Sequence, residues 1–266
     1  MPQQPQLADS QLTINNGVAT LTFQRHDVRN ALTSTAIVDD IVATAAFINA
    51  NQSISALIIT GEGSAFSSGG NIKDMADRAG DFAGEGSELE QAYRTGIQRM
   101  PKAMQSIEVP TIAAINGAAI GAGFDLCNMC DIRIASNKAK FGETFVNLGI
   151  IPGDGGAWFL QRLVGYPRAA ELPFSGRVIA AEEALALGLV MSVVNADKLE
   201  THCQSLAQQM AQQPAAALRR SKRLMLMSPR MQLDDFLDVC AAFQSLSHET
   251  DEHRQAIELF LKKMKS

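Results

Sequence analysis

"GAAIGAGFDLCNMCD" (Gly117–Asp131) is a run of small residues that leads into an apolar segment and contains one early carboxylate, Asp125. It follows "TIAAI" (111–115), a short apolar run that predicts a buried strand. Glycine and alanine allow another molecule to approach the backbone closely. The first N–H groups of a helix have no partner within the helix, and they lie at the positive end of its dipole. The stretch therefore predicts a strand, a tight loop and a helix whose first turn can bind a negatively charged atom.

A second segment of the same kind lies earlier in the chain. "GSAFSSGGNIKDM" (Gly63–Met75) follows the apolar run "ALIIT" (56–60), and Asn71 is suited to cap a helix that begins at Ile72. Two backbone N–H groups aimed at one point form an oxyanion hole. Taken singly, each loop is explained better by tight turns and close helix–strand packing. Neither loop fits a dinucleotide fingerprint, and the chain has no Walker A sequence.

The rest of the chain alternates strands and helices. "VATLTF" (18–23) predicts a strand after an Asn-Asn-Gly turn, "IRIAS" (132–136) predicts another, and "LTSTAIVDDIVATAAFINAN" predicts a helix that begins at a Ser or Thr cap. This order indicates an α/β core with buried strands. Residues 76–91 predict a mobile surface loop or a broken helix, and the chain after Ala180 is expected to be wholly helical.

Composition excludes several classes of protein. The 266 residues, 46% of them hydrophobic, suffice for one large domain, and the net charge of −5 disfavours nucleic acid as a partner. The basic cluster "RRSKR" (219–223) is interpreted as a solvated helix face. No signal peptide or membrane span is expected, and four cysteines in a chain of this length indicate a reducing, cytoplasmic compartment.

Reactive side chains are few outside the glycine loops. Cys127 and Cys130 form a C-x-x-C, but no second ligand pair for zinc follows, so both are predicted to be buried helix thiols. The four histidines lie outside the loops and are expected at the surface, which disfavours a Ser-His-Asp hydrolase and a metal site. They are His26, His202, His248 and His253.

Several segments in the same order resemble the crotonase (enoyl-CoA hydratase/isomerase) superfamily: "AFSSGGNIKDM", "VPTIAAINGAAIGAGFDLCNMCDIRIAS", "AKFGETFVNLGIIPGDGGAWFLQRLVG" and "FSGRVIAAEEALALGLVMSVV". The resemblance extends from Arg25 to the final helix. It implies a crotonase (ClpP/crotonase-like) fold of repeated ββα turns, with an acyl-CoA site in residues 1–180. Residues 181–266 would form a helical region for trimerisation that completes the coenzyme A site. The resemblance also implies coenzyme A thioester substrates, no separate cofactor, and a homotrimer or homohexamer.

The resemblance assigns the oxyanion hole to the N–H groups of Gly70 and Ala122. Ala122 replaces a more usual glycine, which is acceptable because the backbone N–H acts and a methyl group is small. Asn71 stands where the family often has Asp, and we interpret it as a helix cap only.

The acid–base residues depart from the family pattern. A typical hydratase has two glutamates; here Asp125 occupies the first position and Phe145, which cannot transfer a proton, the second. We rank Asp154, in "IPGDGG", and Asp125 first as proton carriers. Glu143 comes third, and in an extended segment it would point to the same side as Phe145. Structural roles remain open for all three: a carboxylate at a helix N-terminus, a turn-forming Asp and a buried hydrogen bond.

The substrate-binding positions implied by the resemblance lie in four places. Arg25 and Arg29 are near coenzyme A phosphates, Lys263 reaches a neighbouring subunit's nucleotide, and the loop with Ala65, Phe66 and Ser68 cradles adenine and pantetheine. Trp158, followed by Phe159, lines an acyl pocket. Simple exposure of the cations and core packing of the aromatic residues are the alternatives.

These observations predict an enoyl-CoA hydratase that acts on a 2-enoyl-CoA through a thioester enolate held by an oxyanion hole. The alternatives are a Δ3-Δ2 enoyl-CoA isomerase, which needs a single carboxylate base, and a non-catalytic acyl-CoA-binding protein. Neither nucleic acid nor a membrane is expected as a partner.

Overall fold

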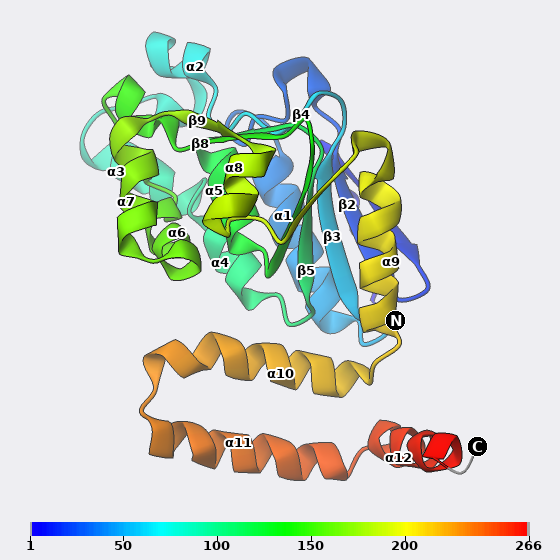
Figure 1. Cartoon of the computed structure of the whole chain (residues 1–266). Helices are drawn as coiled ribbons and strands as arrows, with labels where there is room; N and C mark the ends of the chain where they lie inside the picture. The colour runs from blue at the N-terminus through cyan, green and yellow to red at the C-terminus, as the bar shows by residue number, and fades with distance from the viewer. Residues whose placement is uncertain (1, 265–266) are drawn as a thin grey trace.

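The computed structural model describes residues 2–264, which form a two-sheet body and a helical arm that extends from it (Figure 1). Within these residues the larger sheet has the strand order β1-β2-β3-β5-β7-β10 and the smaller sheet has the order β4-β6-β8-β9. Neighbouring strands are parallel except for the pairs β1–β2 and β8–β9. The strands are β1 Ser10–Asn15, β2 Val18–Phe23, β3 Ala56–Gly61, β4 Ala65–Ser67, β5 Thr111–Ile115, β6 Ala118–Ile120, β7 Ile132–Ser136, β8 Lys140–Gly142, β9 Val178–Ala180 and β10 Ser192–Val194.

Helices cover both sheets and build the arm (Figure 1). The α-helices are α1 Ile37–Ala50, α2 Ile72–Asp77, α3 Ser87–Thr95, α4 Arg99–Ser106, α5 Ala122–Met129, α6 Gly156–Val164, α7 Tyr166–Ser175, α8 Ala181–Leu187, α9 Leu199–Ala211, α10 Ala215–Met227, α11 Leu233–His248 and α12 Asp251–Met264. The short 3₁₀ helices are η1 His26–Val28, η2 Gly80–Phe82, η3 Thr144–Leu148, η4 Ala196–Lys198 and η5 Ser228–Arg230.

The strands predicted from apolar runs are confirmed as β2, β3, β5 and β7. The turn before β2 has φ values of +48° at Asn16 and +79° at Gly17. Both lie in the left-handed region that a two-residue hairpin requires, which explains the Asn-Gly pair. The strands of the smaller sheet have three residues each, too few for a periodic pattern to reveal them. The broken helix predicted over residues 76–91 is confirmed, because α2, η2 and α3 follow one another there.

The predicted Ser or Thr cap of α1 is confirmed only in part: the Thr35 hydroxyl accepts a long hydrogen bond of 3.4 Å from the Ile37 N–H, the first N–H of the helix. Ala36 is the N-cap, and no side-chain hydrogen bond caps the helix from that position. Instead, the Asp9 carboxylate accepts a hydrogen bond of 2.7 Å from the Ala36 N–H. Within α1, the buried Asp40 carboxylate accepts hydrogen bonds from the N–H groups of Ala8 and Asp9. A carboxylate distant in sequence thus adds to the local Thr35 contact, which sequence spacing does not reveal.

The chain after Ala180 is not wholly helical. Ser192–Val194 forms β10, which pairs in parallel with β7 at the edge of the larger sheet. Next, α9 packs on the same sheet through Leu199, Cys203 and Ala207, all buried. The chain leaves the body only after α9, and α10 to α12 form the arm (Figure 1).

The interpretation of the basic cluster 219–223 as a solvated face is wrong for two of its members. Arg219 and Lys222 are 7% and 8% exposed. The Arg219 guanidinium donates hydrogen bonds to the carbonyl oxygens of Ile48, Asn51 and Ile54. These long cations reach out of α10 into the body and attach the arm to it.

Lys222→Met is expected to destabilise this attachment. The Lys222 ammonium lies 2.7 Å from a carboxylate oxygen of Asp131 and donates a hydrogen bond to the Val109 carbonyl. Removing the charge leaves both acceptors short of a donor, so we expect the free energy of unfolding to fall by about 1–3 kcal/mol. Urea unfolding measures this, with exposed Arg223→Met as the matched control. Equal losses in the two variants would contradict a specific role for Lys222.

All four cysteines are free thiols, and Cys127 and Cys130 are buried in and beside α5 as predicted. Burial raises the pKa of Cys130 to about 12, so its thiol stays protonated. In residues 2–264, none of the helices has the length and apolar character that crossing a bilayer requires.

Candidate active site

The two glycine loops meet because their strands are neighbours in the smaller sheet. β4 pairs in parallel with β6, and each strand leads into a loop and a helix. At the contact, a methyl group placed on Gly69 would lie 3.0 Å from the Ala122 nitrogen and 2.5 Å from the Ile120 carbonyl oxygen. Gly69 also has φ +78°. Only glycine allows the first loop to approach the start of α5 this closely.

Gly70 and Ala122 line one cavity of about 40 Å³ between these loops. α5 begins at Ala122 after Gly121, which has φ +52°, so the first N–H of the helix has no intrahelical acceptor. Among the described residues, neither the Gly70 N–H nor the Ala122 N–H donates a backbone or side-chain hydrogen bond. Two unpartnered N–H groups at one small cavity are what an oxyanion hole requires.

Three carboxyl groups cluster beside this cavity. Asp125, Glu143 and Asp154 are 0%, 1% and 3% exposed. Their six side-chain oxygens receive no hydrogen bond of good geometry from the described residues. Asp125 lies within hydrogen-bonding reach of both Glu143 and Asp154. Because buried polar groups are normally paired, carboxyl oxygens left unpartnered at this depth favour the protonated, uncharged form.

The local fold explains why the three groups meet. Asp125 is in the first turn of α5, Glu143 follows β8, and Asp154 ends the loop before α6. The Asp125 carboxylate packs against the start of α6, where a methyl group on Gly156 would lie only 1.8 Å from its Oδ1. Gly156 therefore makes room for the carboxyl cluster.

Burial governs the protonation of the cluster. It raises the pKa of Asp125 well above its usual range, and the charges of Asp154 and Glu143 act in the same direction. Burial also raises the pKa of Glu143 to about 7, against a hydrogen bond with Asp125 that lowers it. The pKa of Asp154 is raised by burial as well. At neutral pH the cluster therefore holds at least one proton and can both donate and accept one.

Only Asp154 of the three carboxyls lines the inner cavity, and Phe145 forms part of its wall. Glu143 was predicted to point to the same side as Phe145 in an extended segment. The segment is not extended there, because η3 begins directly after Glu143.

Tyr93 of α3 also lines the cavity. Burial and the charge of Asp154 raise the pKa of Tyr93. No motif marked Tyr93, since it lies in the charged, glycine-containing segment between α2 and α4.

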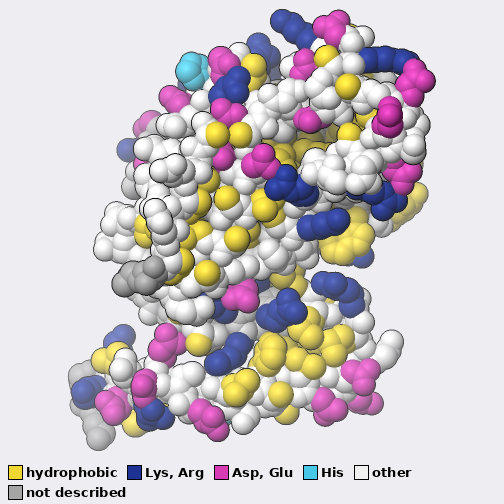
Figure 2. Space-filling model, turned by 180° about the vertical axis from the view of Figure 1, so that it is seen from behind, with side chains coloured by type: hydrophobic (Ala, Val, Ile, Leu, Met, Phe, Trp, Pro, Cys, Tyr) yellow, Lys and Arg dark blue, Asp and Glu magenta, His cyan; other side chains and the backbone are white. Residues whose placement is uncertain are grey.

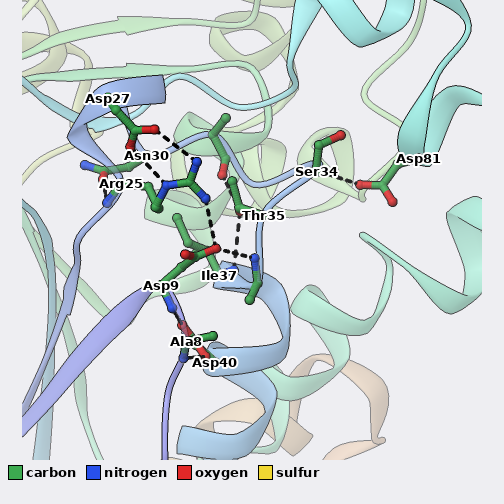
Figure 3. A network of polar contacts seen from close by, with 12 residues as sticks. Ala8, Asp9, Arg25, Asp27, Asn30, Ser34, Thr35, Ile37, Asp40 and Asp81 are labelled. Carbon is green, nitrogen blue, oxygen red and sulfur yellow. Dashed lines mark hydrogen bonds and ion pairs between the residues drawn. The ribbon is translucent and has the colours of Figure 1, made fainter.

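Arg25 lies in a network of carboxylates (Figure 3). Its guanidinium is 3.0 Å from Asp27 and 3.2 Å from Asp9. These contacts involve all three guanidinium nitrogens. The network joins the segment just before β1 to the loop after β2. This arrangement favours a structural role for Arg25 over the predicted phosphate contact.

Arg29 differs from Arg25. It is exposed, has φ +54°, and its carbonyl accepts a hydrogen bond from the Ser68 N–H. Arg29 and Ser68 are thus brought together, and their contacts with coenzyme A stay a prediction. Ala65 and Phe66 are buried in β4, so only their backbone is available to a ligand.

The remaining predicted residues lie away from the inner cavity. Trp158 is 41% exposed and packs against the buried Phe159. The Arg162 guanidinium stacks over the Trp158 ring in a cation–π contact. Trp158 lines a different cavity of about 450 Å³, on the other side of Asp154. Lys263 is exposed on α12. In Figure 1, α12 lies at the end of the arm, away from the body that contains both glycine loops.

Stability is expected to depend on pH through Glu143. The folded protein keeps a proton on Glu143 up to about pH 7, whereas its ordinary pKa is 4.5. The folded state therefore binds more protons between these values, and this contribution to stability is complete below pH 4.5 and is lost as the pH rises through about 7. Urea unfolding across this range should show a shallower decline for Glu143→Gln. Identical pH profiles for variant and parent would contradict the protonated cluster.

Comparison with known proteins identifies the family of this chain. The sequence profile of the family described as "Enoyl-CoA hydratase/isomerase" matches residues 13–266. A probable enoyl-CoA hydratase of Rhodobacter capsulatus is 34% identical over 250 residues, which is 94% of this chain and 93% of that protein. The 1,2-epoxyphenylacetyl-CoA isomerase of Escherichia coli is 32% identical over 255 residues, covering 94% of each chain.

A solved structure of similar shape is the enoyl-CoA hydratase from Bacillus anthracis. It has a TM-score of 0.89 and 29% identity, covering 96% of this chain and 97% of that one. The fold is therefore the crotonase fold, and the relatives named above are enzymes of acyl-CoA thioesters. The chain belongs to the enoyl-CoA hydratase/isomerase family.

Proposed function

We propose that this protein is an enoyl-CoA hydratase that adds water across the double bond of a 2-enoyl-CoA. One observation carries the proposal: two unpartnered N–H groups, Gly70 and Ala122, share a small cavity with a carboxyl group that belongs to a proton-holding cluster. The N–H groups would bind the thioester oxygen, and the cluster would supply both the base and the acid.

The reaction follows from where charge develops. Attack of water at C3 moves an electron pair from the double bond onto the thioester oxygen and forms an enolate. Each well-placed N–H donor stabilises that charge by about 3–4 kcal/mol. Asp154, which lines the cavity, accepts the proton of the attacking water. A proton from the cluster then bonds to C2, which restores the thioester and completes the addition of one water molecule.

The cluster compensates for Phe145 at the position of the second glutamate. General acid–base catalysis needs groups that exchange protons near neutral pH. Asp125 and Glu143 lie behind Asp154 and hold protons that it can exchange. In this proposal Asp154 contacts the substrate directly, whereas Asp125 and Glu143 are positioning residues that set its protonation.

A double-bond isomerase is the second candidate. Asp154 is the only one of the three carboxyls that lines the inner cavity, and moving a proton along an acyl chain needs a single base.

Incubation with a 2-enoyl-CoA and, separately, a 3-enoyl-CoA distinguishes these reactions. Chromatography of the acyl-CoA products should show a 3-hydroxyacyl-CoA from the first substrate. Conversion of the 3-enoyl to the 2-enoyl isomer without hydration would favour the isomerase. If tight acyl-CoA binding occurred without either product, the non-catalytic binder would be favoured.

The proposal extends to coenzyme A binding and assembly. Arg29, Ser68 and the backbone at Ala65 and Phe66 would contact coenzyme A, with Lys263 contributed by a neighbouring subunit. We propose a homotrimer or homohexamer joined through residues 181–266. In its support, no residue described in α11 or α12 is buried, and large apolar side chains are exposed there. Figure 2 shows such side chains gathered along the arm.

A cytoplasmic location and independence from a cofactor complete the proposal. The free thiols agree with a reducing compartment. The chemistry above uses only carboxyl and N–H groups, with coenzyme A entering as part of the substrate.

A further inference from the structure

The inner cavity is too small for more than the reacting end of a substrate. Its volume of about 40 Å³ corresponds to roughly three water molecules, at about 10–15 Å³ each on the same measure. A thioester carbonyl held by Gly70 and Ala122, with the adjoining double bond near Asp154, occupies this space. Any longer acyl chain must continue elsewhere.

A second, larger cavity adjoins the first. It has a volume of about 750 Å³ and lies between α2, η2, α3 and η3. The two cavities share four lining residues, Met75, Phe82, Tyr93 and Ile150. A chain that passes these side chains therefore leaves the inner cavity directly into the outer one.

The lining of the outer cavity suits an apolar chain. It includes Ile72, Leu89 and Leu148, and Ile72 is 61% exposed without a ligand. The charged side chains described among its lining are Arg78 and Glu85, which pair with each other at 3.0 Å. No cation remains there for a phosphate, so the nucleotide part of coenzyme A is a poor occupant and a hydrocarbon chain is a good one.

We propose that the outer cavity binds the acyl tail of the substrate, so that the enzyme prefers linear 2-enoyl-CoA thioesters of medium and long chain length over short ones. The identity of the reacting end rests on the proposed function. The preference for length rests only on the size, lining and continuity of the two cavities.

Chain-length profiles test this inference. With the full-length protein, kcat/KM is measured for 2-enoyl-CoA substrates of four, eight and twelve carbons, all below their micelle-forming concentrations. Each methylene buried in the outer cavity favours binding by about fourfold. Incomplete burial reduces this, and we expect kcat/KM to rise at least tenfold from four to twelve carbons. A flat or falling profile with activity on the four-carbon substrate would overturn the inference and leave the proposed function intact.

A blocking variant locates the tail. Ala76 is exposed on α2 and lines the outer cavity but not the inner one. Ala76→Phe should therefore lower kcat/KM for the twelve-carbon substrate at least tenfold and change the four-carbon value less than twofold. Ala83→Phe is the matched control, because Ala83 is an exposed alanine nearby in sequence that lines neither cavity. Equal effects of the two substitutions, or equal losses for both chain lengths, would refute the placement.

Binding of saturated thioesters separates this inference from the reaction itself. Calorimetry with butyryl-CoA and dodecanoyl-CoA gives dissociation constants that need no turnover. Suppose that no hydration were found. If dodecanoyl-CoA still bound more tightly than butyryl-CoA, and Ala76→Phe abolished that difference, the tail site would be supported. Equal dissociation constants for both ligands would refute it.

Discussion

Asp154→Asn is expected to lower kcat for hydration of a 2-enoyl-CoA by about 10²–10⁴-fold, the usual contribution of a positioned acid–base group. Asn has nearly the same shape and cannot accept the proton of the attacking water. The binding groups Gly70 and Ala122 are backbone N–H groups and stay unchanged. Steady-state kinetics and calorimetry should therefore show a large loss in kcat with little change in the affinity for acyl-CoA.

Asp81→Asn provides the matched control. Asp81 lines the same inner cavity, but it is exposed and its carboxylate accepts a hydrogen bond of 2.8 Å from the Ser34 N–H (Figure 3). An amide oxygen can accept the same bond, so we expect kcat to change less than about threefold, since the group stays hydrogen-bonded. If Asp154→Asn retained parental kcat on every active substrate, Asp154 would not be the proton carrier.

Gly156→Ala is expected to disrupt the site through the carboxyl cluster. The added methyl group would lie 1.8 Å from Oδ1 and 2.2 Å from Oδ2 of Asp125, so that carboxyl must move. Overpacking of this kind costs about 1–3 kcal/mol in stability. A displacement near 1 Å in an active site costs about 10²-fold in rate. We expect both losses, measured by urea unfolding and by kcat.

Gly149→Ala separates this effect from the general effect of replacing a glycine. Gly149 ends η3 with φ +69°, and a methyl group there would meet no atom within 4 Å. Its replacement should cost about 1 kcal/mol from backbone conformation alone and leave kcat nearly unchanged. Parental kcat in Gly156→Ala would contradict the tight packing of Asp125 on α6.

The glycine loops and their strands were predictable because each carries a local signal. An apolar run, small residues and a capping residue identify β3, β5 and the start of α2, and the Asn71 cap is confirmed by a hydrogen bond of 3.1 Å from the Lys73 N–H. The resemblance to the family then ordered these segments into one fold. The capping of α1 by Asp9 was not predictable, because the partner comes from outside the helix.

The candidate site was only partly accessible from the sequence. Asp125, Glu143 and Asp154 were all named, but their arrangement as one buried cluster depends on how α5, β8 and α6 pack. The burial of Arg219 and Lys222 was missed for a related reason, since a basic run beside apolar residues is usually solvated. The outer cavity depends on the fold of residues 72–93, where composition indicated only a loop or a broken helix.

The pairing of β4 with β6 has a consequence for how enzymes of this shape diversify. Hydrogen-bonded strands lie about 4.8 Å apart, and Gly70 and Ala122 follow these two neighbouring strands by three and two residues. The separation of the two proposed donors is thus inherited from main-chain geometry and owes little to side-chain identity. The acids around the site can therefore be replaced without changing the place where the oxygen binds.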